Sequence, residues 1–405
     1  MASGVVIVGA GQAGFQLAVS LRSDGYDGPV ILVGDEPFLP YQRPPLSKAY
    51  LAGKQDIEAV TLRPESFYVE QGINLLMGET ASAIDRTART VRLSSGSALP
   101  YDSLVLATGA RNRLLPVVGA GFDNVCYLRT RAEAVNLGER LEAARSLVII
   151  GGGFIGLEVA AAAAMLGKEV TVIEAQARLM ARAVAPAMSE FFRALHTRHG
   201  VRVVLNGFVR EVIGHAGRVS GVAMDGGDAY PADVVVIGIG VVPHVDLAEA
   251  AGLPCGNGII VNEHLKTADD NIYAIGDCAW HPNRYAGCPV RIESVQNAVD
   301  QARSVSASII GRPRPYDAVP WFWTDQFEAK LQMAGLSVGG DLAVTRGDPD
   351  TGRFSVCYFK GDRLMAIDSV NRPGDHMAGR KLLAAGARLT PTQAADLNFD
   401  LKALL

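Results

Sequence analysis

Two glycine-rich turns in this chain of 405 residues have the spacing that phosphate chemistry requires. Residues 9–14 read GAGQAG and residues 151–156 read GGGFIG, and each turn follows an apolar run, at 5–8 and 147–150. Glycines let the backbone turn sharply and approach a phosphate, and a helix that starts there offers free N–H groups and partial positive charge. Each turn therefore predicts a pyrophosphate site. The glycines concerned are Gly9, Gly11 and Gly14 in the first turn and Gly151, Gly153 and Gly156 in the second.

An acidic residue closes the next apolar run after each turn. It is Asp35 or Glu36 in the first case and Glu174 in the second. A carboxylate at this position accepts hydrogen bonds from ribose hydroxyls, so each unit reads as a complete dinucleotide site. The alternative is a glycine turn that only packs a helix on a sheet, which two complete units together disfavour. A chain that holds two dinucleotides usually moves electrons between them.

These turns need strands and helices to position them, and the pattern around them is α/β. The first unit predicts a strand at 5–8, a helix at 14–22, a strand at 30–33 and, after a proline-rich loop, a helix ending near Leu51. The second unit runs from about 147 to 240, and the apolar segment 271–279 is predicted to return to the first sheet.

The expected architecture is two Rossmann-like dinucleotide-binding domains followed by a small C-terminal domain of mixed α and β structure. We expect a discontinuous first domain at 1–110 and 245–319, a second domain at 111–244 and the C-terminal domain at 320–405. Trp321 and Trp323 lie at the start of this last part.

Composition narrows the function further. The net charge of −4 gives no support for nucleic-acid binding, and the longest apolar stretch, 159–166, is too short to span a bilayer and predicts a buried helix. No basic leader precedes the first apolar run, which favours the cytoplasm. The five cysteines form no CxxC pair and no zinc-ligand spacing, so we expect no metal site and small buried side chains.

The motifs resemble those of FAD-dependent NADH:ferredoxin reductases of the putidaredoxin reductase kind. These pass electrons to a two-iron ferredoxin that serves a haem-thiolate monooxygenase, and close cousins serve dioxygenases. Disulfide reductases with the same glutathione-reductase-type plan carry redox cysteines, which the segment 40–48 here lacks. The likeness covers essentially the whole chain, and the segments that carry it, in order, are 9–14, 44–48, 107–109, 151–158, 276–278, 291–295 and 321–323.

The resemblance implies FAD in the first domain and NAD in the second. Asp277 would then bind the ribityl chain, although a turn-capping aspartate is the alternative, and Val295 would open a helix whose N-terminus faces the flavin. The positions implied for FAD are Gly9, Gly11, Ala13, Gly14, Asp35, Lys48, Ala81, Ala107, Thr108, Gly109, Arg129, Asp277 and Val295. Those implied for NAD are Gly151, Gly153, Ile155, Gly156 and Glu174.

Lys48 and Glu158 are the candidate catalytic pair. By the resemblance each belongs near the reactive nitrogen of the flavin, one from each dinucleotide domain, where a cation favours hydride acceptance and the carboxylate fixes the cation. Buried together they would be costly unless paired. The alternative is an ordinary solvated lysine and an ordinary helical glutamate.

The expected partner is an acidic two-iron ferredoxin held by a basic surface. Arg63 and Arg303 match basic docking positions of the family, whereas a further lysine position falls on Gln332, with Lys330 nearby. This departure suggests a different cognate ferredoxin. Other readings are an NADH reductase for another acceptor, such as rubredoxin, a quinone or a dioxygenase ferredoxin, and a non-catalytic flavoprotein signalling module, which the acidic charge disfavours.

Overall fold

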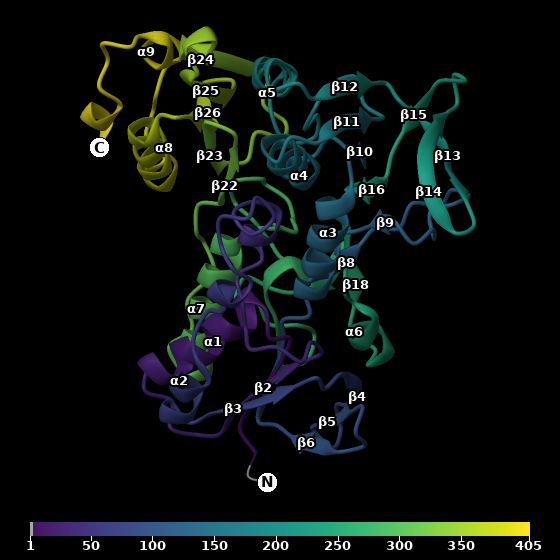
Figure 1. Ribbon diagram of the computed structural model, residues 1–405. Helices are drawn as coiled ribbons and strands as arrows, with labels where there is room; N and C mark the ends of the chain where they lie inside the picture. Colours follow the sequence, from purple (N-terminus) through teal and green to yellow (C-terminus); the bar gives the residue numbers. More distant parts are fainter. Residues whose placement is uncertain (1–2) are drawn as a thin grey trace. The chain divides into compact units, whose positions relative to one another are not determined.

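The computed structural model describes residues 3–405, which divide into two compact units (Figure 1). The first unit contains the described residues up to Gln42, with Thr61–Arg111 and Val242–Phe322. The second contains Arg43–Val60, Asn112–Val241 and Trp323–Leu405. The chain thus passes between the units at 42/43, 60/61, 111/112, 241/242 and 322/323. The passage at 111/112 falls in β8 (Ala110–Asn112), and the passage at 241/242 falls in β17 (Val241–Pro243).

A parallel five-stranded sheet forms the centre of the first unit. Its order is β20 (Ile272–Ala274), β7 (Ser103–Leu106), β1 (Val5–Val8), β2 (Val30–Gly34) and β3 (Ile73–Met77). The central strand is buried along its whole length, as expected for a parallel sheet covered on both faces. Because β20 pairs with β7, the predicted return of the chain to the first sheet is confirmed.

Helices and small sheets complete the first unit. The helices α1 (Gln12–Ser23) and α7 (Val295–Ile309) pack against each other, and α2 (Glu65–Glu70) and α6 (Asp246–Ala250) are shorter. One small antiparallel sheet contains β4 (Ala81–Asp85), β5 (Thr90–Leu93) and β6 (Ala98–Pro100). A second small sheet is mixed and contains β18 (Cys255–Gly256), β19 (Gly258–Ile260) and β21 (Ala279–Trp280).

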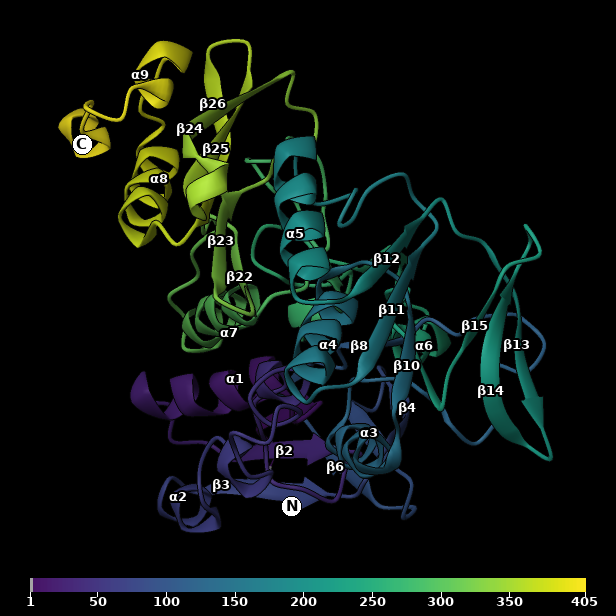
Figure 2. The ribbon, with the colours of Figure 1, turned by 45° about the horizontal axis from the view of Figure 1, so that its top comes forward.

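The second unit repeats the parallel sheet. Its order is β12 (Arg202–Leu205), β11 (Glu169–Glu174), β10 (Ser146–Ile150), β16 (Val234–Ile237) and β9 (Val125–Cys126). Figure 2 shows α4 (Phe154–Met165) and α5 (Pro186–Arg198) on the same side of this sheet. The unit also holds α3 (Arg131–Ala143) and a sheet of β13 (Val209–His215), β14 (Arg218–Met224) and β15 (Ala229–Pro231). The buried helix predicted at 159–166 corresponds to the second half of α4. It is buried up to Ala163, whereas Met165 and Leu166 are exposed and Leu166 lies just beyond the helix.

The C-terminal part is an antiparallel sheet with helices beside it. Its order is β22 (Trp321–Gln326), β23 (Ala329–Gly335), β26 (Arg363–Val370), β25 (Arg353–Lys360) and β24 (Leu342–Asp348). The helix α8 (Pro373–Ala385) packs on β26 and β23, and α9 (Pro391–Ala395) packs on β24. This mixed α and β structure confirms the expectation for the tail.

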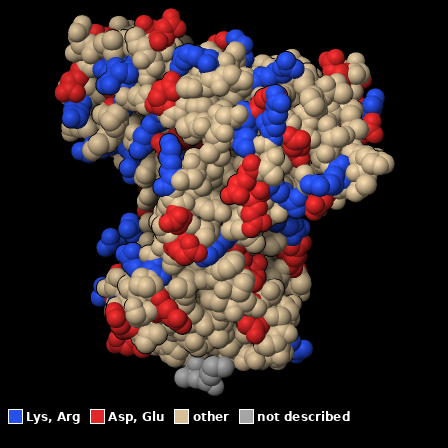
Figure 3. Space-filling view, viewed as in Figure 1, with Lys and Arg blue, Asp and Glu red and all other residues tan. Residues whose placement is uncertain are grey.

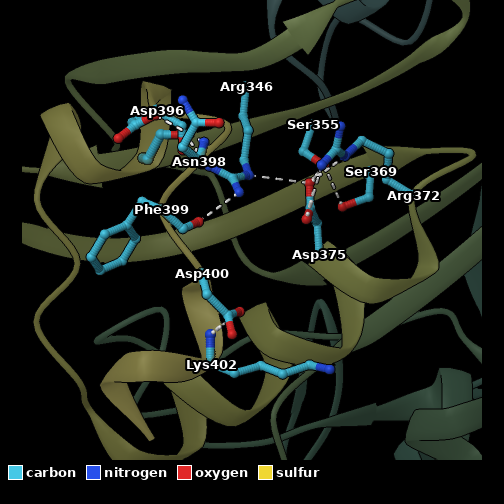
Figure 4. Close-up of polar contacts among 11 residues, drawn as sticks. Arg346, Ser355, Ser369, Arg372, Asp375, Asp396, Asn398, Phe399, Asp400 and Lys402 are labelled. Carbon is cyan, nitrogen blue, oxygen red and sulfur yellow. Dashed lines mark hydrogen bonds and ion pairs between the residues drawn. The ribbon is translucent and has the colours of Figure 1, made fainter.

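A buried polar cluster fastens the chain end to this sheet (Figure 4). Arg346 on β24, only 4% exposed, lies 3.4 Å from the carboxylate of Asp375 through Nε and donates through Nη2 to the carbonyl of Phe399 at 2.9 Å. Asp375 also accepts from Arg372 at 2.6 Å and from Ser355 at 3.0 Å. Each buried charge is therefore paired or hydrogen-bonded, as a low-dielectric interior requires.

The structure differs from the sequence prediction after β2. The helix expected to end near Leu51 is absent, because Pro44–Ser47 forms a short 3-10 helix, η1, followed by turns. η1 contacts α3 and α4, and residues 43–60 accordingly group with the second unit. The division into three domains at the predicted boundaries stays a prediction.

Residues 3–405 contain neither a membrane-spanning helix nor a cluster of metal ligands. No helix there is both long and apolar enough to cross a membrane. Within the same range, no three His, Cys, Asp or Glu side chains gather as ligands for a metal ion.

Candidate active site

The first glycine turn is shaped by contacts that exclude a side chain at two positions. Gly9 has φ +113°, and a Cβ there would lie 2.2 Å from the carbonyl oxygen of Ala107. A Cβ on Gly14 would lie 1.9 Å from the carbonyl oxygen of Gly9. Gly11 differs, because no heavy atom of the described structure lies within 4 Å of its would-be Cβ. Packing thus explains Gly9 and Gly14, whereas Gly11 borders open space.

The second turn has the same geometry. Gly151 has φ +112°, and its would-be Cβ lies 2.4 Å from the carbonyl oxygen of Gly238. A Cβ on Gly156 would lie 2.1 Å from the carbonyl oxygen of Gly151. Gly153 again has nothing described within 4 Å of its would-be Cβ, and Ile155 in the first turn of α4 is 45% exposed.

Both helices that follow begin without a capping side chain. α1 after Gly11 and α4 after Gly153 have no side-chain hydrogen bond at the N-cap and no acidic residue in the first turn. Their first N–H groups and the positive ends of their dipoles therefore remain available to an anion. This open space beside uncapped helix ends fits the pyrophosphates of two dinucleotides.

Of the predicted acids, Glu174 is the one bonded to its glycine turn. Its Oε2 accepts from the backbone N–H of Gly152 at 2.7 Å, and its Oε1 accepts from Gln176 N–H at 2.7 Å. At the first turn, Asp35 is exposed and Glu36 accepts from the Tyr41 hydroxyl at 2.8 Å. The carboxylate of Glu174 is therefore fixed beside the turn.

Several other predicted FAD positions gather around the first turn. Ala107 meets Gly9 at the end of β7, and the hydroxyl of Thr108 donates to the carbonyl of His244 at 2.6 Å. Half-buried Asp277 follows Gly276, whose would-be Cβ lies 3.1 Å from Ala13.

The remaining predicted FAD positions are spread more widely. Gly109, with φ +69°, follows Thr108, and half-buried Val295 opens α7 behind the N-cap Ser294. Ala81 lies half-buried at the start of β4. Arg129 belongs to the second unit, where its carbonyl accepts from Arg43 at 2.5 Å.

Lys48 and Glu158 form a buried ion pair, as predicted. Lys48 Nζ lies 3.1 Å from Glu158 Oε1, and the two side chains are 16% and 3% exposed. Both belong to the second unit rather than to different domains, because η1 packs on α4. Burial raises the pKa of Glu158, and the charge of Lys48 is the largest influence in the opposite direction.

Four neighbours of this pair were not assigned to it from the sequence, although Trp323 was noted at the start of the C-terminal part. The hydroxyls of Ser47 and Thr324 donate to Glu158, Trp323 places its ring centroid 5.8 Å from Lys48 Nζ, and Asp325 lies 3.9 Å from it. Ser47 adjoins Lys48, and Thr324 follows the segment 321–323. Both therefore lie in or next to segments that carry the family resemblance, and this was the sequence signal that could have identified them.

The cysteines offer no redox pair. All five lie within the described range and are free thiols. Burial raises the pKa of Cys126 to about 11 and that of Cys357 to about 12, and it also raises the pKa of Cys278. Reactive thiols need the opposite shift. Cys126, Cys278 and Cys357 are therefore inert packing groups. The expectation of small buried side chains is wrong for Cys255, which is half-buried, and for Cys288, which is exposed.

The three proposed docking residues are exposed. Arg303 is 63% exposed and lies 3.8 Å from Asp300, and Arg63 stacks 5.5 Å from the Phe67 ring centroid. Lys330 is exposed on β23. On the face seen in Figure 3, basic and acidic side chains are interspersed.

The fold and the paired glycine turns define a flavoprotein oxidoreductase frame, and comparison with known proteins identifies the family. Residues 3–302 match the pyridine nucleotide-disulphide oxidoreductase model, and residues 321–405 match the reductase C-terminal model. The chain belongs to the pyridine nucleotide-disulphide oxidoreductase family. Members of this kind use FAD and NAD(H), which fit the two cradles described above.

Relatives share the whole chain. Rhodocoxin reductase of Rhodococcus erythropolis is 54% identical over 98% of this chain and 93% of its own. The ferredoxin reductase of the CYP199A2 system of Rhodopseudomonas palustris is 48% identical, with a TM-score of 0.97 and full coverage of both chains. The putidaredoxin reductase in its covalent complex with putidaredoxin is 43% identical, with a TM-score of 0.96 and coverage of 99% and 98%.

Proposed function

We propose that this protein transfers electrons from NADH through FAD to a two-iron ferredoxin that supplies a monooxygenase. The observation that carries the proposal is the end-to-end likeness to a reductase solved in covalent complex with its redox partner, C-terminal sheet included. The five free cysteines support it, because a disulfide substrate route would need a redox thiol and the segment 40–48 contains none.

The chain contributes binding and electrostatics, while FAD supplies the hydride-accepting and electron-releasing chemistry. The first glycine turn, with Asp277 nearby, holds FAD through the free N–H groups of α1. The second turn holds NADH through α4, with Glu174 accepting from the adenosine ribose. Lys48 contributes the positive charge that favours an electron-rich flavin, and Glu158 fixes that lysine.

The ferredoxin is proposed to bind through exposed basic side chains. Arg63, Arg303 and Lys330 are the candidates, since such ferredoxins are acidic and complementary charge mainly raises the association rate. Replacing Arg303 by Glu should raise the KM for ferredoxin, whereas reduction of ferricyanide, which needs no docking face, should not change. If neither Arg63→Glu nor Arg303→Glu changes ferredoxin turnover, the ferredoxin does not bind through these side chains.

We further propose that FAD occupies a discontinuous domain at 1–110 and 245–319, that NAD occupies 111–244, and that 320–405 supports partner binding. The cytoplasm is the proposed compartment, because NADH is available there and the free thiols would stay reduced.

The experiment that tests the function compares acceptors. The purified FAD-loaded protein is supplied with NADH and, in separate assays, a two-iron ferredoxin, a rubredoxin and a quinone. We expect the highest kcat/KM with the ferredoxin. A higher value with rubredoxin or quinone would reassign the acceptor, while leaving the NADH-oxidising flavoprotein in place.

A further inference from the structure

The carboxylate of Glu158 receives three hydrogen-bond donors although almost no water reaches it. Lys48 Nζ lies 3.1 Å from Oε1, the Thr324 hydroxyl donates to Oε1 at 2.6 Å, and the Ser47 hydroxyl donates to Oε2 at 2.5 Å. Glu158 is 3% exposed and Thr324 is fully buried. A single lysine would pair the charge. The two short hydroxyl contacts therefore add a second means of stabilising the ionised form.

The hydrogen bonds beyond Thr324 have a fixed direction. An ionised carboxylate can only accept, so the single hydrogen of the Thr324 hydroxyl points to Glu158. The hydroxyl oxygen must then accept from Gln326, whose Nε2 lies 3.3 Å away. The carbonyl oxygen of Gln326 is consequently turned to His196 Nε2, at 2.9 Å, and accepts a hydrogen from it.

His196 ends this chain as a neutral donor. It is fully buried in α5, and burial lowers its pKa to about 4. Its Nδ1 has no hydrogen-bond partner among the described residues, so the ring hydrogen belongs on Nε2. Protonation of Glu158 would disrupt this order, because a carboxylic acid would itself need an acceptor where two hydroxyls now donate.

The charged and titratable groups around the pair come from three elements. η1 is followed by Lys48, β22 carries Asp325 at 3.9 Å from Lys48 Nζ, and α5 carries the uncharged His196, three hydrogen bonds from Glu158 through Gln326 and Thr324. Asp325 is half exposed and bears on Lys48 rather than on Glu158. The hydroxyl of Thr324 is therefore the direct contact from the C-terminal strand to the carboxylate.

We propose that Thr324 is a positioning residue, through which strand β22 keeps Glu158 ionised and aimed at Lys48, with Gln326 and His196 orienting the threonine hydroxyl. The consequence for hydride transfer rests on the proposed function of the Lys48–Glu158 pair. The positioning itself does not, because it concerns the protonation state of one carboxyl group.

The test measures Glu158 protonation directly. Infrared difference spectra of the FAD-loaded protein are recorded across a pH series, and the acid carbonyl band of Glu158 is assigned by its loss in Glu158→Gln. In Thr324→Val the protonation midpoint should rise by about one to two pH units, the value of one hydrogen bond to a charged group. Thr324→Ser, which restores a hydroxyl, should return the midpoint toward wild type. Thr345→Val serves as the control variant, because Thr345 is an exposed threonine on β24 of the same sheet.

An unchanged midpoint in folded Thr324→Val overturns the proposal. If that variant does not fold, Gln326→Leu leaves the hydroxyl in place but removes its orienting donor. A smaller upward shift is then expected, and no shift overturns the proposal.

Stopped-flow reduction of the flavin by NADH across the same pH range distinguishes the positioning of Glu158 by Thr324 from the role of the Lys48–Glu158 pair in hydride transfer. A parallel shift of the rate profile supports both proposals. A shifted infrared midpoint with an unshifted rate profile keeps Thr324 as the positioning residue and removes the pair from the hydride step.

Discussion

At the scale of single residues, the site depends on a charge pair removed from water. Lys48 Nζ and Glu158 Oε1 lie 3.1 Å apart, and the loss of Lys48 would leave the buried charge of Glu158 without its counter-ion. The sequence could predict this pairing, because the family resemblance assigns both residues to one place. It could not predict the hydroxyls of Ser47 and Thr324, because serine and threonine occur throughout the chain and their contacts depend on tertiary packing.

Removing either charge should slow reduction of the flavin. Lys48→Met keeps much of the stem but removes the cation, and Glu158→Gln removes the anion that fixes it. We expect each to slow anaerobic flavin bleaching by NADH by about tenfold, equivalent to about 1.4 kcal/mol in the barrier. Because the two act as one unit, the double variant should lose less than the sum. Wild-type bleaching rates in both single variants would make the pair purely structural.

NADH should be used in preference to NADPH. The fixed carboxylate of Glu174 can accept from a ribose 2′-hydroxyl but repels a 2′-phosphate. Glu174→Gln removes the charge and keeps one oxygen that can accept from Gly152, but it loses the bond from the N–H of Gln176. The ratio of kcat/KM for NADH to kcat/KM for NADPH should be smaller in the variant than in the wild type. Equal use of both nucleotides by the wild type would overturn the role of Glu174.

At the scale of elements, two strand–turn–helix units present free helix N-termini. The turn glycines and the return strand follow from local patterns. The helix expected to end near Leu51 was wrong, because Pro44–Ser47 forms a short 3-10 helix that packs on α3 and α4 and is followed by turns. Hydrophobic periodicity carries no information about packing between segments that are distant in the sequence.

The two kinds of turn glycine should respond differently to alanine. Gly153→Ala meets no described atom within 4 Å, so it should fold normally while its methyl group obstructs the pyrophosphate and raises the KM for NADH. Gly156→Ala would place a Cβ 2.1 Å from the carbonyl oxygen of Gly151 and should lower the free energy of unfolding. Urea unfolding and nucleotide kinetics of both variants provide the check. An unaltered KM in Gly153→Ala would place the nucleotide elsewhere.

The C-terminal sheet should carry a pH-dependent stability term. Asp368 is 1% exposed and accepts from the Tyr358 hydroxyl at 2.5 Å, and burial raises its pKa to about 7 from 3.8. The folded state therefore retains a proton that the unfolded state loses. This contribution is complete below pH 3.8 and is lost as the pH rises through 7.

Asp368→Asn removes that titration. Relative to the variant, the wild type should lose up to about 1.4 kcal/mol of unfolding free energy per pH unit across this window. Urea midpoints at a series of pH values measure the difference. Parallel curves for the two proteins would show that Asp368 is already ionised when folded.

At the scale of the whole molecule, the chain combines two dinucleotide frames with a C-terminal sheet that contributes Thr324 to the charge pair. The net charge gave no support for nucleic-acid binding, but the acceptor cannot be read from charge, because basic and acidic side chains are interspersed on the face in Figure 3. Acceptor identity is a property of a complementary surface and must be measured.

The central claim is that electrons pass from NADH through the flavin to a ferredoxin without a protein thiol. The most direct measurement is an anaerobic double-mixing stopped-flow experiment, in which the protein is reduced with one equivalent of NADH and then mixed with oxidised two-iron ferredoxin. The account predicts that about two ferredoxins are reduced per NADH as the flavin colour returns, and equally so in a folded, FAD-loaded variant with all five cysteines replaced. A reduced flavin that leaves the ferredoxin oxidised, or transfer that is lost with the cysteines, would contradict it.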